Sequence, residues 1–116
     1  MKKILVVDDE EHIRQLYQEE LEDMGFEVTS VPGGAEALAA MDGTKFDLVT
    51  LDMRMKGMDG IETLRKMKEK DKTLPVIIAS AYEEYKQDFG SWCSEAYIVK
   101  SSDMASFRDT IKKILG

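Results

Sequence analysis

The strongest constraint on the fold is a fivefold alternation of short apolar runs with longer segments that carry apolar residues at helical spacing. Short runs rich in β-branched residues are typical of strands buried on both faces of a sheet. Segments with apolar residues every three or four positions are typical of helices that cover such a sheet on one side. The predicted strands are Lys3–Val7, Phe26–Ser30, Phe46–Leu51, Pro75–Ala79 and Ala96–Val99.

The segments between and after these runs predict five helices. Gly25 directly follows the first helical stripe and suits a helix stop. Strands that are separated by single helices run parallel and are joined by right-handed crossovers, so the chain is predicted to be an α/β protein with helices on both faces of its sheet. The helical stripes run from Ile13 to Met24, Ala35 to Ala39, Ile61 to Lys68, Tyr85 to Trp92 and Met104 to Leu115.

Length and charge narrow the class of protein. A chain of 116 residues is expected to form one domain, residues 1–116, with a real hydrophobic core. No apolar run approaches the roughly 20 residues that a membrane-spanning helix needs, and acidic residues follow the first apolar run at once, so we expect a cytosolic protein. The net charge of −7 makes direct binding of nucleic acid by this domain unfavourable.

The counts of cysteine and histidine exclude several kinds of site. A single cysteine, Cys93, cannot form an internal disulfide, and a single histidine, His12, cannot complete a Cys/His zinc site. His12 stands in a run of acids and is expected to be a solvated side chain. Any metal bound here must therefore be a hard ion with oxygen ligands.

Polar residues follow four of the five predicted strands. Asp8 and Asp9 follow the first strand, Asp52 the third, Ser80 the fourth and Lys100 the fifth. Only the second strand lacks a strong polar candidate, which is explained if it lies at the sheet edge. The resulting strand order is 2-1-3-4-5, so we predict a flavodoxin-like, doubly wound (βα)5 three-layer sandwich with its site at the carboxyl ends of the strands.

Three carboxylates brought together repel one another, and a cation relieves that repulsion. Mg²⁺ suits carboxylate, carbonyl, water and phosphate oxygens. A metal-bound carboxylate cluster with a lysine and a hydroxyl can bind a phosphoryl group, and an aspartate there can act as the nucleophile. The predicted covalent species is an aspartyl phosphate.

Each of these residues also has a purely structural interpretation. Asp8 could cap the first helix with Glu11 completing a capping box. Asp52 could cap a turn, Ser80 could bond to loop backbone, and Lys100 could be a solvated residue at a strand end. Their joint occurrence at four of five strand ends favours a functional site.

The sequence resembles the receiver domain of the response regulators of bacterial two-component phosphorelays. The resemblance covers essentially the whole chain, and the middle segment is the most specific because Asp52 and Gly60 stand at the family's spacing. It rests on KKILVVDDEEHIR, FDLVTLDMRMKGMDGIETLRKMK, PVIIASAYEE and AYIVKSSD.

The resemblance implies a role for each site residue. Asp52 would accept a phosphoryl group from a phosphohistidine on a sensor histidine kinase or a histidine phosphotransfer protein. Asp9 would bind Mg²⁺ directly and Asp8 directly or through water, while Asp52 and the backbone carbonyl of Arg54 would complete the protein ligands. Lys100 would hold a phosphate oxygen.

The family also implies a conformational switch. Ser80 would move toward the phosphate and Tyr97 would follow it inward. The resemblance further allows an attached output domain or effector protein, and a homodimer through the face formed by the fourth helix, fifth strand and fifth helix.

Three departures from the family pattern stand near the site. Lys56 and Ser101 occupy positions where the family usually has proline, and the bond before the second proline is typically cis. A cis bond before a residue other than proline costs about 2.5–4 kcal/mol. The stretch from Ser80 to Lys100 is also slightly shorter than usual.

The sequence therefore predicts a phosphorylation-driven switch in signal transduction. Such a domain supplies the chemistry for its own phosphorylation and dephosphorylation but is not an enzyme with a separate substrate. A degenerate receiver that only binds a partner is one alternative. A Mg²⁺-dependent phosphohydrolase is another, although Asp52-Met53-Arg54 lacks a second aspartate two positions after the first.

Overall fold

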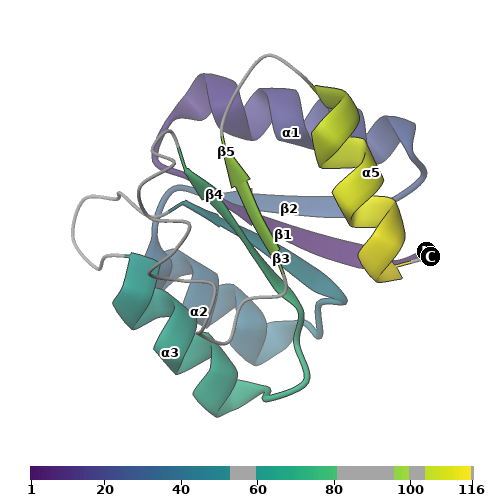
Figure 1. Cartoon of the computed structure of the whole chain (residues 1–116). Coiled ribbons are helices and arrows are strands. Elements are labelled where there is room, and N and C mark those ends of the chain that lie inside the picture. The colour runs from purple at the N-terminus through teal and green to yellow at the C-terminus, as the bar shows by residue number, and fades with distance from the viewer. Residues whose placement is uncertain (53–59, 81–95, 100–103, 116) are drawn as a thin grey trace.

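The computed structural model describes residues 1–52, 60–80, 96–99 and 104–115. Within these ranges the chain forms a parallel sheet between two layers of helices, with α1 and α5 on one face and α2 and α3 on the other (Figure 1). The strands are β1 (Lys3–Val7), β2 (Glu27–Val31), β3 (Leu48–Asp52), β4 (Val76–Ser80) and β5 (Ala96–Val99). The helices are α1 (Glu11–Asp23), α2 (Gly34–Gly43), α3 (Gly60–Lys70) and α5 (Met104–Leu115).

All strand pairs in the sheet are parallel, and the order β2-β1-β3-β4-β5 agrees with the order predicted from the polar strand ends. The α/β class is thus confirmed. The predicted helical stripe from Tyr85 to Trp92 lies outside the described residues, as do Cys93 and the Lys100-Ser101 bond, so these predictions stand as they were made.

Apolar side chains alternate between the two faces of the sheet, which explains why the central strands are continuous apolar runs. In β1, Leu5 and Val7 pack toward α2 and α3, whereas Ile4 and Val6 pack toward α1 and α5. All residues of β3, and all of β1 except Lys3, are almost fully buried, whereas β2 is partly exposed because it lies at the sheet edge. A strand buried on both faces has no solvent side on which to place polar residues.

Three predicted strands begin one or two residues earlier than the observed ones: Pro75 precedes β4, and the other two predicted strands begin at a phenylalanine. Phe26 precedes β2 and Phe46 precedes β3, yet both pack against the core. Their apolar character reflects burial in the turn before the strand rather than pairing within the sheet. Strand limits are set by pairing with the neighbouring strands, which the apolar pattern alone does not reveal.

A glycine follows α1, and a contact with the N-terminal segment is made at the end of α5. Helix α1 ends before Gly25, whose φ of 94° confirms the predicted stop, since a left-handed conformation favours glycine. At the end of α5, Lys2 Nζ donates a hydrogen bond of 3.1 Å to the carbonyl oxygen of Leu115, so the two ends of the chain lie side by side (Figure 1). No helix in the described ranges has the length and apolar content needed to cross a membrane.

Candidate functional site

Three of the predicted site residues converge at the carboxyl edge of the sheet. Ligand oxygens from Asp8, Asp9 and Asp52 all lie within 4.8 Å of one another. Asp52 is the last residue of β3, and Asp8 and Asp9 follow β1, which pairs with β3 through Val7 and Leu51. Adjacent parallel strands end at the same edge, and this topology brings together acids that are more than 40 positions apart in the sequence.

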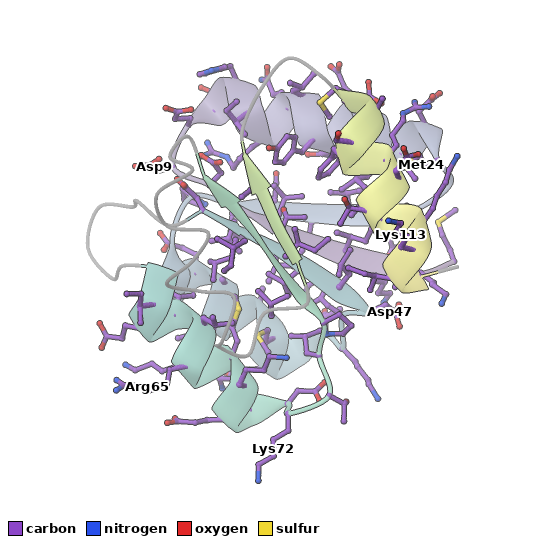
Figure 2. All side chains as sticks on the ribbon, viewed as in Figure 1. Asp9, Met24, Asp47, Arg65, Lys72 and Lys113 are labelled. Carbon is purple, nitrogen blue, oxygen red and sulfur yellow. The ribbon has the colours of Figure 1, made fainter. Side chains whose placement is uncertain are left out.

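The three acids differ in their exposure to solvent. Asp8 is 1% exposed and Asp52 is 4% exposed, whereas Asp9 is exposed. Figure 2 shows Asp9 at the edge of the sheet beside the start of α1, with Asp47 toward the opposite edge. The site therefore has two buried carboxylates and one that reaches solvent, so that an ion or a phosphoryl donor can approach from the side of Asp9.

The alternation of β1 and β3 explains the direction of the two buried acids. Asp8 continues the series Ile4 and Val6, and Asp52 continues the series that includes Leu48, whose side chains face α1 and α5. Both acids therefore leave the sheet on the same side. The same two-residue period that buries the core thus also aligns the carboxylates.

Hydrogen bonds fix the loop that carries Asp8 and Asp9. The backbone N–H of Asp8 donates to the carbonyl oxygen of Val31 at 3.2 Å, and the backbone N–H of Glu10 donates to Asp8 Oδ1 at 2.9 Å. Arg14 Nη1 donates to the backbone carbonyl oxygen of Asp8 at 2.6 Å. Main chain and side chain of Asp8 are thus both held by neighbouring residues.

The structural interpretation in which Asp8 caps the first helix is wrong. The N-cap of α1 is Glu10, and no side-chain hydrogen bond caps this helix. Asp8 instead accepts the bond from Glu10 two residues ahead of it, the arrangement of an Asx-turn. Its side chain belongs to the carboxylate cluster and shapes the loop that leads into the helix.

The donor set fits a hard divalent cation. Carboxylate oxygens at this mutual distance repel one another unless protons or a cation intervene, and Mg²⁺ prefers such oxygens. Within the described ranges this is the group of acids that could hold a metal, and it consists of the three residues predicted from the sequence.

The remaining predicted site residues are placed only in part. Ser80 is the last residue of β4 and pairs with Val99 of β5, and Tyr97 lies within β5 beside Ile78. Strand β4 pairs with β3 through Asp52 and Ala79, so Ser80 follows the residue beside the acid. Arg54, Lys56, Lys100 and Ser101 lie outside the described residues.

Arg14 is a residue of the site region that the sequence interpretation missed. It stands six positions after Asp8, on the first turns of α1, and reaches back to the loop. The position of Arg14 relative to Asp8 belongs to none of the motifs that point to the acidic residues. The signal that could have found it is a long cationic side chain one to two turns into the helix that follows the acidic pair.

His12 behaves as predicted. Its side chain is 78% exposed and lies 3.9 Å from Glu10, at the start of α1. It makes no part of the carboxylate cluster among the described residues. A solvated histidine among acids therefore requires no catalytic role.

The fold and the site together define a flavodoxin-like α/β protein that gathers carboxylates at the carboxyl edge of a parallel sheet. The profile of the family described as "Response regulator receiver domain" matches residues 4–112. This chain therefore belongs to the response regulator receiver domains of two-component signal transduction, as the sequence resemblance implied.

Individual relatives agree with this assignment. Sporulation initiation phosphotransferase F of Bacillus subtilis is 38% identical over 116 residues, which cover 98% of this chain and 94% of the relative. The response regulator TrrA of Thermotoga maritima, solved in complex with Mg²⁺-BeF, superimposes with a TM-score of 0.93 at 40% identity, over 99% of this chain and 100% of that one.

Two further kinds of relative bear on partners and on length. TrrA in complex with the histidine kinase ThkA superimposes with a TM-score of 0.91 at 40% identity and full coverage of both chains. The transcriptional regulatory protein PhoP of Bacillus subtilis is 40% identical over 72% of this chain, but the match spans only 35% of PhoP. The chain thus corresponds to one part of that longer regulator.

Proposed function

We propose that this receiver domain is a phosphorylation switch in which Asp52 is the phosphoacceptor. The observation that carries the proposal is the cluster of Asp8, Asp9 and Asp52, whose oxygens lie within 4.8 Å of one another at the carboxyl edge of the sheet. Asp52 is the last residue of β3, the central strand of the sheet. Its carboxylate is buried, but the cluster to which it belongs reaches solvent at Asp9.

The proposed reaction is phosphoryl transfer to a carboxylate oxygen. An Asp52 oxygen forms a bond to phosphorus while the bond from phosphorus to the donor breaks, and the donor leaves with the electron pair. Asp8 and Asp9, with Asp52 and the Arg54 carbonyl, would hold Mg²⁺, which when bound neutralises charge on the phosphoryl oxygens. Lys100 would bind one of these oxygens.

The conformational readout is part of the same proposal. Ser80 on β4 and Tyr97 on β5 would act as the switch residues. Strand β4 pairs with β3, and β5 lies beyond β4. The phosphorylated state is stabilised only by the contacts that it makes and the other state does not. The domain would turn over no substrate other than its own aspartyl phosphate.

The proposed phosphoryl donor is a sensor histidine kinase or a phosphotransfer protein. The kinase complex of TrrA supports the first, because that receiver superimposes over the full length of this chain. The relation to longer transcriptional regulatory proteins supports control of an output domain or an effector.

Intact mass after incubation with acetyl phosphate and Mg²⁺ tests the proposal. Wild-type protein is expected to gain the mass of one phosphoryl group, with acetate as the leaving group, and EDTA should prevent the gain. Asp52→Asn should gain nothing, whereas Asp42→Asn, which changes an exposed aspartate outside the cluster, should behave as wild type.

The opposite results are equally informative. Labelling of Asp52→Asn at wild-type level would place the phosphoacceptor elsewhere. A folded wild-type protein that binds Mg²⁺ but takes up no phosphoryl group, from acetyl phosphate or from a phosphorylated kinase, would indicate a degenerate receiver. Steady hydrolysis of phosphoesters would indicate a phosphohydrolase.

A further inference from the structure

Arg14 contacts the loop of the carboxylate cluster through the main chain rather than through a carboxylate. Its Nη1 lies 2.6 Å from the backbone carbonyl oxygen of Asp8, and the side chain is half-buried. Acidic side chains stand close by in the sequence at Glu10 and Glu11, yet Arg14 joins none of the ion pairs found among the described residues. The guanidinium is thus committed to one carbonyl of the loop.

That carbonyl belongs to the peptide bond between Asp8 and Asp9. Because a peptide unit is planar, fixing the direction of the Asp8 carbonyl also fixes the Asp9 nitrogen and the Asp9 Cα, from which the Asp9 side chain departs. The other side of Asp8 is held by the bond from its N–H to Val31, and its Oδ1 is held by the N–H of Glu10. Arg14 supplies the restraint that these two bonds leave open.

The restraint matters most for Asp9. Asp8 and Asp52 are almost fully buried and directed by the sheet, whereas Asp9 is exposed and stands in the loop after β1. Packing therefore does little to orient Asp9, and the orientation of the preceding peptide plane does more. The main chain of Arg14 is fixed because its backbone N–H donates to the carbonyl oxygen of Glu10 at 3.1 Å in the first turn of α1.

We propose that Arg14 is a positioning residue of the metal site, which holds the Asp8-Asp9 peptide plane so that the two acids present their oxygens together with Asp52. The inference rests on the proposed role of this cluster as the Mg²⁺ site. It assigns Arg14 no contact with the metal or the phosphoryl group. Groups that orient metal ligands typically change metal affinity by about 10–100-fold when they are removed.

Charge and geometry make opposite predictions for the loss of Arg14. A guanidinium near three carboxylates repels a cation, so removal of the charge alone would strengthen binding of Mg²⁺. Loss of the hydrogen bond would release the loop and weaken binding. The sign of the change in affinity therefore separates the positioning role from a purely electrostatic one.

The experiment is titration of Mg²⁺ into wild type, Arg14→Gln, Arg14→Lys and Arg65→Gln by isothermal titration calorimetry. Arg65 is an exposed arginine on α3 that points away from the body of the domain (Figure 2), so Arg65→Gln removes the same charge outside the site. Arg14→Gln is expected to raise the dissociation constant of Mg²⁺ about tenfold. Arg14→Lys, which can still donate to a single carbonyl, should stay within about threefold of wild type, and Arg65→Gln should match wild type.

A second readout excludes a merely structural role. The melting temperature is measured for each protein in EDTA and at increasing Mg²⁺, because a ligand that binds the folded state stabilises it according to its affinity. In Arg14→Gln the Mg²⁺-dependent rise should begin at about tenfold higher Mg²⁺, whatever the melting temperature in EDTA. The Mg²⁺ concentration for half-maximal labelling by acetyl phosphate should shift in parallel, with the rate at saturating Mg²⁺ retained.

Three outcomes would overturn the positioning role of Arg14, and they differ in what they imply for the proposed function. Binding of Mg²⁺ by Arg14→Gln that equals or exceeds wild-type affinity overturns the positioning role while the proposed function stands. Failure of the wild-type protein to bind Mg²⁺ removes both. A lower melting temperature with an unchanged Mg²⁺ midpoint would also overturn the inference, since it assigns Arg14 to folding alone.

Discussion

Tyr17 of α1 and Phe107 of α5 stack with ring centroids 4.5 Å apart and an interplanar angle of 17°. Both rings are almost fully buried in the cluster between the sheet and these two helices. The stack joins the helix that follows the acidic loop to the last helix of the chain. It therefore ties the C-terminal element to the framework of the site.

Replacement of either ring should lower the free energy of unfolding and so measure how much this contact stabilises the protein. Phe107→Ala is expected to lower the free energy of unfolding by about 3–5 kcal/mol, because it leaves a cavity in a packed core. A double-mutant cycle with Phe107→Leu and Tyr17→Leu isolates the ring pair, for which we expect a coupling of about 0.5–1.5 kcal/mol. Urea denaturation provides the free energies, and a coupling near zero would show that only burial matters.

Replacement of Thr50, unlike that of Phe107, is predicted to stabilise the protein. It is 1% exposed in the middle of β3, and its Oγ1 has no hydrogen-bond partner within the described ranges. Thr50→Val is expected to raise the free energy of unfolding by about 1 kcal/mol, because a buried unpaired hydroxyl costs free energy. Thermal and urea unfolding measure the change.

The matched control is Thr63→Val on α3. Thr63 is also fully buried, but it has an interaction partner in the structure. Its replacement should therefore destabilise the protein where that of Thr50 stabilises it. A loss of stability in both variants would mean that the Thr50 hydroxyl is bonded in solution.

The close packing of the three acids predicts that the effect of Asp9→Asn on stability depends on Mg²⁺. Asp9→Asn removes one of three mutually repelling charges, so it should stabilise the metal-free protein by on the order of 1 kcal/mol. The same change removes an oxygen ligand and should reduce the additional stability that Mg²⁺ confers. Melting temperatures in EDTA and in Mg²⁺ should therefore move in opposite directions relative to wild type. A parallel shift in both conditions would contradict a shared metal site.

Asp71, in the loop after α3, is predicted to make a contribution to folding stability that depends on pH. The hydroxyl of Thr73 donates to Asp71 Oδ1 at 2.8 Å and the backbone N–H of Thr73 donates to the same oxygen at 3.0 Å, and these bonds lower the pKa of Asp71 below its ordinary value of 3.8. A carboxyl with a lowered pKa in the folded state stabilises that state at neutral pH. The contribution is lost as the pH falls from 3.8 through the lower folded pKa.

Asp71→Asn should therefore lower the free energy of unfolding at neutral pH by about 0.5–1 kcal/mol. Below the folded pKa of Asp71, wild type and variant should converge. Urea denaturation at a series of pH values measures the difference between the two proteins. A difference that is constant with pH would show that the carboxylate charge plays no part.

The architecture and the acidic cluster could be predicted from the sequence for the same physical reason. Apolar runs that alternate with helical stripes leave few arrangements other than a parallel sheet, and parallel strands end at one edge. Asp8, Asp9 and Asp52 could thus be placed together before any coordinates were known. The sheet order followed from the absence of a polar residue after β2.

Other features depend on contacts that the apolar pattern and the acidic motifs do not specify. The contribution of Arg14 depends on the reach of a long side chain back over the first turn of α1 to the carbonyl of Asp8. The capping interpretation of Asp8 failed because the loop extends to Glu10 before the helix begins. Phe26 and Phe46 extended the predicted strands because apolar turn residues and apolar strand residues are indistinguishable until the core is assembled.

The close grouping of Asp8, Asp9 and Asp52 also has an evolutionary consequence. Charges that repel in the metal-free protein are tolerated because their chemistry is selected. A random library of this domain sorted only for thermal resistance should accumulate neutral residues at these three positions early. Selection for signalling would restore the three aspartates. At these positions, selection for function and selection for thermal stability therefore favour different residues.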